Sequence, residues 1–250
     1  MANRTGMPGS YLLIAKDGKP VVRKAYGLAN LELGVPAKPD HLFTLASVSK
    51  QMITVAILQL ARQGKLSLTD DIRKYLPALD THNKLITIEQ LLTHTSGLYS
   101  ETGATGAKGK TLFDLSISHG ILSDEEFLQY VMEHDLHFDP GTDWGYNGYG
   151  YFIAFFIIEK ASGMPFNEYM RKNLFEPAGM TNSFSKVDGN RLGLYGIQNL
   201  VSNYYQPDAD GKWIWRDMRR LTPLNFYERY AIVSSLDDLL KWDIAFAQRT

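Results

Sequence analysis

The stretch FTLASVSKQM, from Phe43 to Met52, places a serine, Ser47, three residues before a lysine, Lys50. A helical pattern runs on from Ser47 to Gln63, and its apolar residues leave almost no polar face: Met52, Ile53, Val55, Ala56, Ile57, Leu58, Leu60 and Ala61. A helix that is hydrophobic all round is buried. Gly64 follows, and glycine commonly ends a helix. The stretch therefore predicts a central helix beginning at Ser47.

Ser47 and Lys50 would share one face of this helix, because residues three apart are neighbours on a helix surface. A serine hydroxyl is a poor nucleophile until a neighbouring group takes its proton. At the helix start its oxygen would lie in the positive field of the helix dipole, and an apolar surround would disfavour the charge of the lysine. The pair is a candidate nucleophile and base. The alternative is an N-cap serine beside a lysine that points to water.

The same spacing recurs at Ser183 and Lys186. This second pair lies in a polar stretch that leads into Val187-Asp188-Gly189, with no buried helix behind it. We interpret it as a solvated loop, so the spacing alone does not identify a site.

Composition narrows the classes of function. The chain has 250 residues, of which 44% are apolar and 21% charged, and its formal net charge is −1, as in an ordinary globular protein. No basic stripe indicates nucleic acid or an anionic membrane as a partner. The absence of cysteine excludes disulfides, thiolate metal sites and a cysteine nucleophile. The most apolar run, Tyr149 to Ile158, is too short to span a bilayer. We expect no membrane span, and no export signal is visible at the amino terminus.

One segment has the composition of a metal site. Glu133-His134-Asp135-Leu136-His137 resembles a ligand cluster, but the end of a surface helix explains it better. We expect no metal and no cofactor.

Turn and capping signals outline the other elements. Strands are predicted at Tyr11 to Lys16 and Val21 to Tyr26, around the hairpin signal Asp17-Gly18. The first does not alternate with polar residues, so we expect both its faces to be covered. Helix starts are predicted at Thr87, Ser123 and Ser235, and helices at 152–160 and 166–175. Polar loops are predicted at 100–111 and 187–212. The second loop contains Tyr204 and Tyr205, and Trp213 and Trp215 follow directly after it.

These signals predict an α/β (α+β) fold in a single domain, 1–250, with an antiparallel or mixed sheet and a helical lobe. Within it, 10–45 forms the sheet hairpin and lead-in, 46–235 the helical lobe with the active-site motifs, and 236–250 a returning helix. Only the opening hairpin is clearly β, and a two-stranded sheet is marginal in water. We therefore expect the sheet to be incomplete in this chain, and the chain to be truncated at its carboxyl end.

Several blocks along the chain occur together in one known family. They are FTLASVSK at 43–50, QGKLSLTDD at 63–71, LLTHTSGL at 91–98, PGT at 140–142 and FEPAGM at 175–180. In this order and spacing the chain resembles the serine β-lactamase-related family, which includes class C β-lactamases, low-molecular-weight penicillin-binding proteins, D-aminopeptidases and family VIII esterases.

The resemblance implies a β-lactamase/transpeptidase-like fold and assigns roles to three residues. Ser47 would be the acylated nucleophile and Lys50 its partner. Tyr146, from the second motif, would be the shared base or acid, provided that adjacent cations stabilise its phenolate. The family habit also implies a periplasmic or secreted protein.

Two departures from the family pattern bear on activity. The family usually has Tyr-x-Asn where this chain has Tyr146-Asn147-Gly148, so Asn147 and Gly148 are the candidate substrate-binding positions. The family's third motif, a strand that supplies one of two oxyanion-hole amides, is not reached before Thr250. Removing one such donor can cost about 10²–10³-fold in rate.

Three hypotheses follow. The first is a serine hydrolase that acts through an acyl-enzyme on an ester, amide or β-lactam carbonyl of a small molecule or peptide. The second is a catalytically impaired relative that binds a peptide or partner in the same cleft. The third is a fragment that self-associates or needs a complementary chain to complete its sheet.

Overall fold

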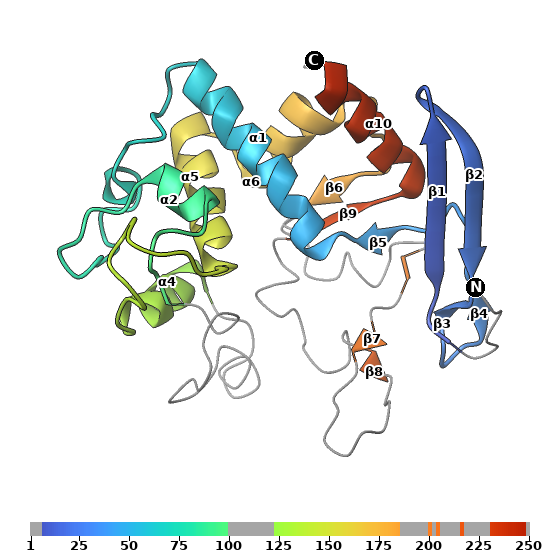
Figure 1. Ribbon diagram of the computed structural model, residues 1–250, viewed down its shortest axis with the longest axis horizontal. Helices are drawn as coiled ribbons and strands as arrows, with labels where there is room; N and C mark the ends of the chain where they lie inside the picture. Colours follow the sequence, from blue (N-terminus) through green and yellow to red (C-terminus); the bar gives the residue numbers. More distant parts are fainter. Residues whose placement is uncertain are drawn as a thin grey trace. The chain divides into compact units, whose positions relative to one another are not determined.

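The computed structural model describes residues 7–99, 123–185, 200–201, 204–205, 216–217 and 231–248 (Figure 1). The fold mixes helices with small antiparallel sheets, which confirms the predicted class. The chain divides into two compact units. Unit 1 comprises 1–46, 171–224 and 231–250, and unit 2 comprises 47–170 and 225–230.

Unit 1 contains the predicted hairpin. Strands β1 (Ser10–Lys16) and β2 (Lys19–Tyr26) pair antiparallel. Asp17 and Gly18 join them with φ of 53° and 71°, and two positive φ angles match the twist of a tight hairpin. Helix α10 (Leu236–Gln248) packs against β1.

The expectation that both faces of the first strand are covered is wrong for the described residues. Successive side chains of a strand point to opposite faces. Tyr11 is partly buried, with its ring centroid 5.6 Å from that of Phe43. Leu12 and Ile14, on the other face, are 37% and 48% exposed. The apolar run predicted cover for both faces, but the described elements of unit 1 bury only the face of Tyr11.

A second sheet in unit 1 has the order β5 (Phe43–Thr44), β9 (Ile232–Ser234), β6 (Phe184–Ser185), all antiparallel. Two further strand pairs, also antiparallel, are β3 (Leu28–Asn30) with β4 (Val35–Pro36) and β7 (Tyr204–Tyr205) with β8 (Arg216–Asp217).

The interpretation of Ser183 as part of a solvated loop is wrong. Ser183 is buried, and its hydroxyl donates to the Asp238 carboxylate at 2.9 Å and contacts the Ser234 hydroxyl at 2.8 Å. A two-residue strand has no periodicity that a sequence can reveal. The polar composition of this segment instead reflects hydrogen bonds to a buried carboxylate.

Unit 2 is built around α5 (Tyr149–Ser162), whose aromatic and aliphatic side chains are almost all buried. It packs against α1 (Ser49–Arg62), α2 (Ile88–Leu92) and α6 (Phe166–Met170) (Figure 1). Unit 2 also contains helix α4 (Asp124–Met132) and a 3₁₀ helix at Ile72–Lys74. The predicted helix is therefore confirmed as one of two long helices in this core. It is not buried all round as predicted, because Leu58 is 45% exposed and the buried apolar residues lie on one face.

The helix boundaries follow the capping signals. Thr87 and Ser123 both form complete capping boxes, and the Ser235 hydroxyl accepts from the Asp238 backbone N–H at 3.2 Å. Helix α5 ends at Gly163 with φ 72°. The helix predicted for 166–175 is α6 followed by a π-helical turn over Arg171–Phe175.

Some predictions fall outside the described residues, namely the loop at 100–111, the solvated position of Lys186, most of the loop at 187–212, and Trp213 and Trp215. Among the helices of the described segments, none has the length and apolarity needed to cross a membrane.

Candidate active site

Ser47 lies in a short 3₁₀ turn, Ala46–Val48, immediately before α1. The α-helix itself begins at Ser49, two residues later than the sequence predicts, with Val48 at its N-cap position. Ala46 has φ of 44°, in the left-handed region. This backbone reversal turns the chain just before Ser47, so a right-handed helical backbone cannot continue back through Ala46.

The structure brings together the three residues predicted for catalysis. The Ser47 Oγ lies 2.6 Å from the Tyr146 Oη, and either atom can donate. The Lys50 Nζ donates to the Ser47 Oγ at 3.0 Å. One hydroxyl therefore has a cationic donor and a phenol within hydrogen-bond distance at the same time.

Two tyrosine rings flank the Lys50 ammonium. Its Nζ lies 4.9 Å from the ring centroid of Tyr146 and 5.4 Å from that of Tyr151, distances at which a cation is attracted to an aromatic face. Tyr151 is itself fixed, because its hydroxyl donates to the Leu92 carbonyl at 2.9 Å and contacts the Thr54 Oγ1 at 3.3 Å. The sequence prediction missed Tyr151, whose tyrosine-rich context gives it no distinguishing signal.

The surroundings of Tyr146 favour the ionised form of its phenol. Burial raises the pKa of Tyr146, but hydrogen bonding by Lys50 and Ser47 together with the charge of Lys50 outweighs burial and leaves this pKa below its ordinary value. A tyrosine can act as a base if a nearby cation stabilises its phenolate, and Lys50 supplies that cation.

Asn147 has a different environment from the one predicted. Its side chain is 3% exposed, its Nδ2 donates to the Leu98 carbonyl at 2.6 Å, and its Oδ1 accepts from the Gly150 N–H at 3.1 Å. An amide bonded to the backbone at both ends secures the turn into α5. The geometry therefore disfavours the predicted contact between Asn147 and substrate.

Gly148 occupies the N-cap position of α5 with φ −72° and ψ −33°. A Cβ atom built there would meet no heavy atom within 4 Å. The backbone thus needs no glycine at this position, and the space beside it is open.

His94 is a site residue to which the sequence prediction assigned no role. Its ring centroid lies 4.7 Å from that of Tyr146, and its Nδ1 accepts from the Asn147 N–H at 3.1 Å. Burial and the charge of Lys50 lower the pKa of His94. The sequence places His94 in the LLTHTSGL block, but only tertiary contacts reveal what it touches.

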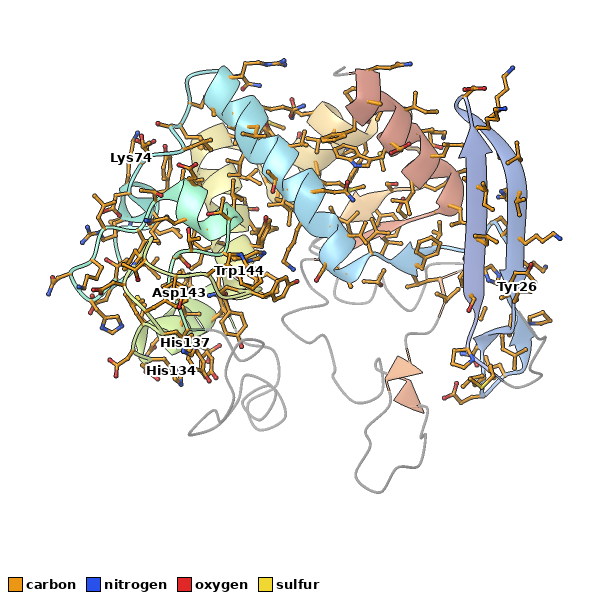
Figure 2. All side chains as sticks on the ribbon, in the orientation of Figure 1. Tyr26, Lys74, His134, His137, Asp143 and Trp144 are labelled. Carbon is orange, nitrogen blue, oxygen red and sulfur yellow. The ribbon has the colours of Figure 1, made fainter. Side chains whose placement is uncertain are left out.

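The histidines of the 133–137 segment belong to an aromatic stack. The rings of His134 and His137 lie 4.0 and 5.3 Å from that of Tyr99, next to the end of α4 (Figure 2). Within the described residues, no group of three or more His, Cys, Asp or Glu side chains could hold a metal ion.

Comparisons with known proteins agree with this geometry. Penicillin-binding protein 4* of Bacillus subtilis (strain 168) is 31% identical over 195 residues, which cover 77% of this chain and 41% of that protein. Esterase EstB of Burkholderia gladioli is 35% identical over 183 residues, which cover 69% of this chain and 45% of that protein. The chain thus spans less than half the length of these curated relatives.

A solved structure extends the likeness to the fold. The octameric penicillin-binding protein homologue from Pyrococcus abyssi superposes with a TM-score of 0.76 at 26% identity, over 97% of this chain and 53% of that chain. The model of the Beta-lactamase family matches residues 1–249, nearly the entire sequence. The chain that sets Ser47, Lys50 and Tyr146 together is therefore a member of the Beta-lactamase family.

Proposed function

We propose that this protein is a serine hydrolase that forms an acyl-enzyme at Ser47 with an ester, amide or β-lactam carbonyl. The observation that carries the proposal is the placement of the Ser47 Oγ, 2.6 Å from the Tyr146 Oη and 3.0 Å from the Lys50 Nζ. Relatives named as an esterase and as a penicillin-binding protein support the same class of reaction.

In the acylation step, the Ser47 oxygen attacks the carbonyl carbon while its proton passes to the ionised Tyr146 oxygen. Lys50 stabilises the phenolate before transfer and donates to the Ser47 oxygen. The bond from the carbonyl carbon to the leaving group then breaks, and the proton on Tyr146 passes to that group. Proton transfer by a positioned side chain contributes about 10²–10⁴-fold to such a reaction.

In the deacylation step, water takes the place of the leaving group. Tyr146 accepts one proton from the water, the hydroxide adds to the acyl carbonyl, and the bond from that carbon to the Ser47 oxygen breaks. The proton on Tyr146 returns to Ser47. Each turnover therefore consumes one water and restores all three residues to their starting state.

The test is intact-mass spectrometry after incubation with a fluorophosphonate and, separately, with a p-nitrophenyl ester and a penicillin. We expect one adduct on the wild-type protein and none on Ser47→Ala. Ser49→Ala is the matched control, because Ser49 lies two residues away and its buried hydroxyl has no hydrogen-bond partner among the described residues. An adduct that persists in Ser47→Ala would assign the reaction to another residue.

A binding module is the second candidate function. It is favoured by one observation: Asn147 is held by the backbone and Gly148 has no side chain, so this segment offers a substrate no free amide. A folded wild-type protein that binds the penicillin reversibly and forms no adduct with any probe would support this candidate over the hydrolase.

Self-association is a further part of the proposal, because the Pyrococcus abyssi homologue is octameric. Light scattering coupled to size exclusion measures it directly. A mass that corresponds to a single chain over a wide range of concentration would contradict it.

A further inference from the structure

His94 contacts the residues on both sides of Tyr146. Its backbone carbonyl accepts from the Gly145 N–H at 3.0 Å, and its ring Nδ1 accepts from the Asn147 N–H at 3.1 Å. Between these two hydrogen bonds its ring lies against the Tyr146 ring, with centroids 4.7 Å apart. One residue thus fixes the backbone before and after the phenol and one side of the phenol itself.

We propose that the neutral imidazole of His94 is a positioning residue that holds Tyr146 against Ser47, and that protonation of His94 releases this hold. The inference rests on the proposed function, because its effect is exerted through the acylation of Ser47. A backbone N–H can only donate, so Nδ1 must be unprotonated in this geometry and the ring proton must lie on Nε2.

Among the charged and titratable groups that face His94, the Lys50 ammonium favours this neutral form. Lys50 approaches from α1, Tyr146 from the loop, and Tyr151 from α5, with its ring centroid 5.4 Å from that of His94. The indole of Trp144 lies edge-on at 6.1 Å and carries no charge. Protonation of His94 would add a second cation near Lys50 and turn Nδ1 from an acceptor into a donor that opposes the Asn147 N–H.

The backbone of His94 indicates how to test the proposal. His94 has φ of 62°, a left-handed conformation that asparagine adopts more readily than most residues. An asparagine side-chain oxygen is also an acceptor placed much as Nδ1 is, but it does not titrate. His94→Asn therefore keeps the acceptor and removes the titration, whereas His94→Phe keeps the ring and removes the acceptor.

The experiment measures the rate of adduct formation with a fluorophosphonate by intact mass, from about pH 4 to about pH 8, a range centred near the ordinary histidine pKa. We expect the wild-type rate to fall more steeply in acid than the titration of Tyr146 alone would give, and this additional fall to disappear in His94→Asn. In His94→Phe we expect a loss of about 10²-fold relative to wild type near neutral pH, because small displacements of a reacting group cost that much. This loss should shrink in acid, where the protonated His94 of the wild type no longer positions Tyr146.

The outcomes separate the two proposals. No adduct on the wild-type protein at any pH would overturn the proposed function. A reactive wild-type protein whose additional acid fall persists in His94→Asn would overturn the role of His94 alone, as would His94→Phe that is labelled at the wild-type rate. Circular dichroism tests whether each variant is folded. If His94→Phe is unfolded, the pH profile of His94→Asn alone decides whether His94 has the proposed role.

Discussion

Tyr146 illustrates how one residue can be influenced in opposite directions by its surroundings. Desolvation favours the neutral phenol, and the ammonium of Lys50 favours the phenolate. Desolvation is the largest single influence, but the hydrogen bonds with Lys50 and Ser47 and the charge of Lys50 together outweigh it. The pKa of Tyr146 therefore lies below its ordinary value, and a larger fraction of the phenol is ionised at neutral pH than in a free tyrosine.

This balance predicts a pH profile. The acylation rate of the wild-type protein should rise with pH to a midpoint below about 10, the ordinary tyrosine pKa. In Lys50→Gln the phenolate loses its cation, so the midpoint should move upward and the rate at neutral pH should fall. Adduct formation measured across the alkaline range checks both changes. An unchanged midpoint in Lys50→Gln would mean that another group sets the profile.

Two glycines near the site should respond in opposite ways to alanine. At Gly97, with φ 71°, a Cβ atom would lie 2.0 Å from the Phe138 carbonyl oxygen, so Gly97→Ala must displace backbone. At Gly148 a Cβ atom meets nothing within 4 Å. We expect Gly97→Ala to lower the free energy of unfolding by several kcal/mol or to prevent folding, and Gly148→Ala to change it by less than about 1 kcal/mol. Urea unfolding of both variants measures the difference.

At the residue scale, sequence reasoning found Ser47, Lys50 and Tyr146, and the structure places them within hydrogen-bond reach of one another. It did not find the roles of His94 and Tyr151, because neither has a chemical signature of its own. Their importance comes from ring contacts between segments about 50 residues apart or more, which a local pattern does not encode.

Among the elements, α10 is joined to the segment around β6 by one buried carboxylate, that of Asp238. Asp238 is 0% exposed and accepts from the Asn182 N–H at 2.7 Å, the Ser183 hydroxyl at 2.9 Å and the Lys241 ammonium at 2.9 Å. Lys241 also donates to the Gly179 carbonyl at 2.7 Å. These bonds join the segment around β6 to the first turns of α10.

Asp238→Ala should therefore be strongly destabilising. It removes the acceptor shared by the Asn182 N–H, the Ser183 hydroxyl and the Lys241 ammonium. Hydrogen bonds to a charged group contribute about 1.5–3 kcal/mol each. Asp237→Ala is the matched control. Asp237 is 42% exposed and pairs with Arg23 at 2.6 Å, and a surface ion pair contributes about 0–1 kcal/mol. Equal losses of unfolding free energy in the two variants would contradict this account.

The elements themselves were largely predictable wherever capping or turn chemistry marks them. Thr87, Ser123 and Ser235 cap helices as their patterns indicate, and Asp17-Gly18 closes the hairpin. The two-residue strands of unit 1 were not predicted. Of these, β5 and β6 form a sheet only through pairing with β9, so no segment of their length carries the information alone.

For the molecule as a whole, acid stability should depend on a turn in unit 2. The Asp70 carboxylate accepts from the Tyr75 hydroxyl at 2.6 Å, the Ser67 N–H at 2.8 Å and the Lys74 ammonium at 2.9 Å. These bonds, led by that from Tyr75, lower the pKa of Asp70 to about 2. A carboxylate with a depressed pKa stabilises the folded state above its unfolded pKa, and this contribution is lost as the pH falls through the folded pKa.

We therefore expect Asp70→Asn to lower the melting temperature at neutral pH. The gap between variant and wild type should close between about pH 4 and about pH 2, where the wild-type carboxylate becomes protonated. Thermal unfolding followed by circular dichroism across this range gives the result. A gap that is independent of pH would show that packing, and not the charge of Asp70, is what the substitution removes.

The division of the chain into two units has a consequence for how the protein can evolve. Unit 2 occupies one long uninterrupted run, 47–170, with the short segment 225–230, and every residue assigned here to the chemistry or its support, Ser47, Lys50, His94, Tyr146 and Tyr151, lies within that run. Sheet-forming segments of unit 1 precede and follow it. Recombination between related genes at these borders would exchange the flanking strands and transmit the reactive set intact, so unit 1 can diversify while the chemistry of unit 2 is inherited as a block.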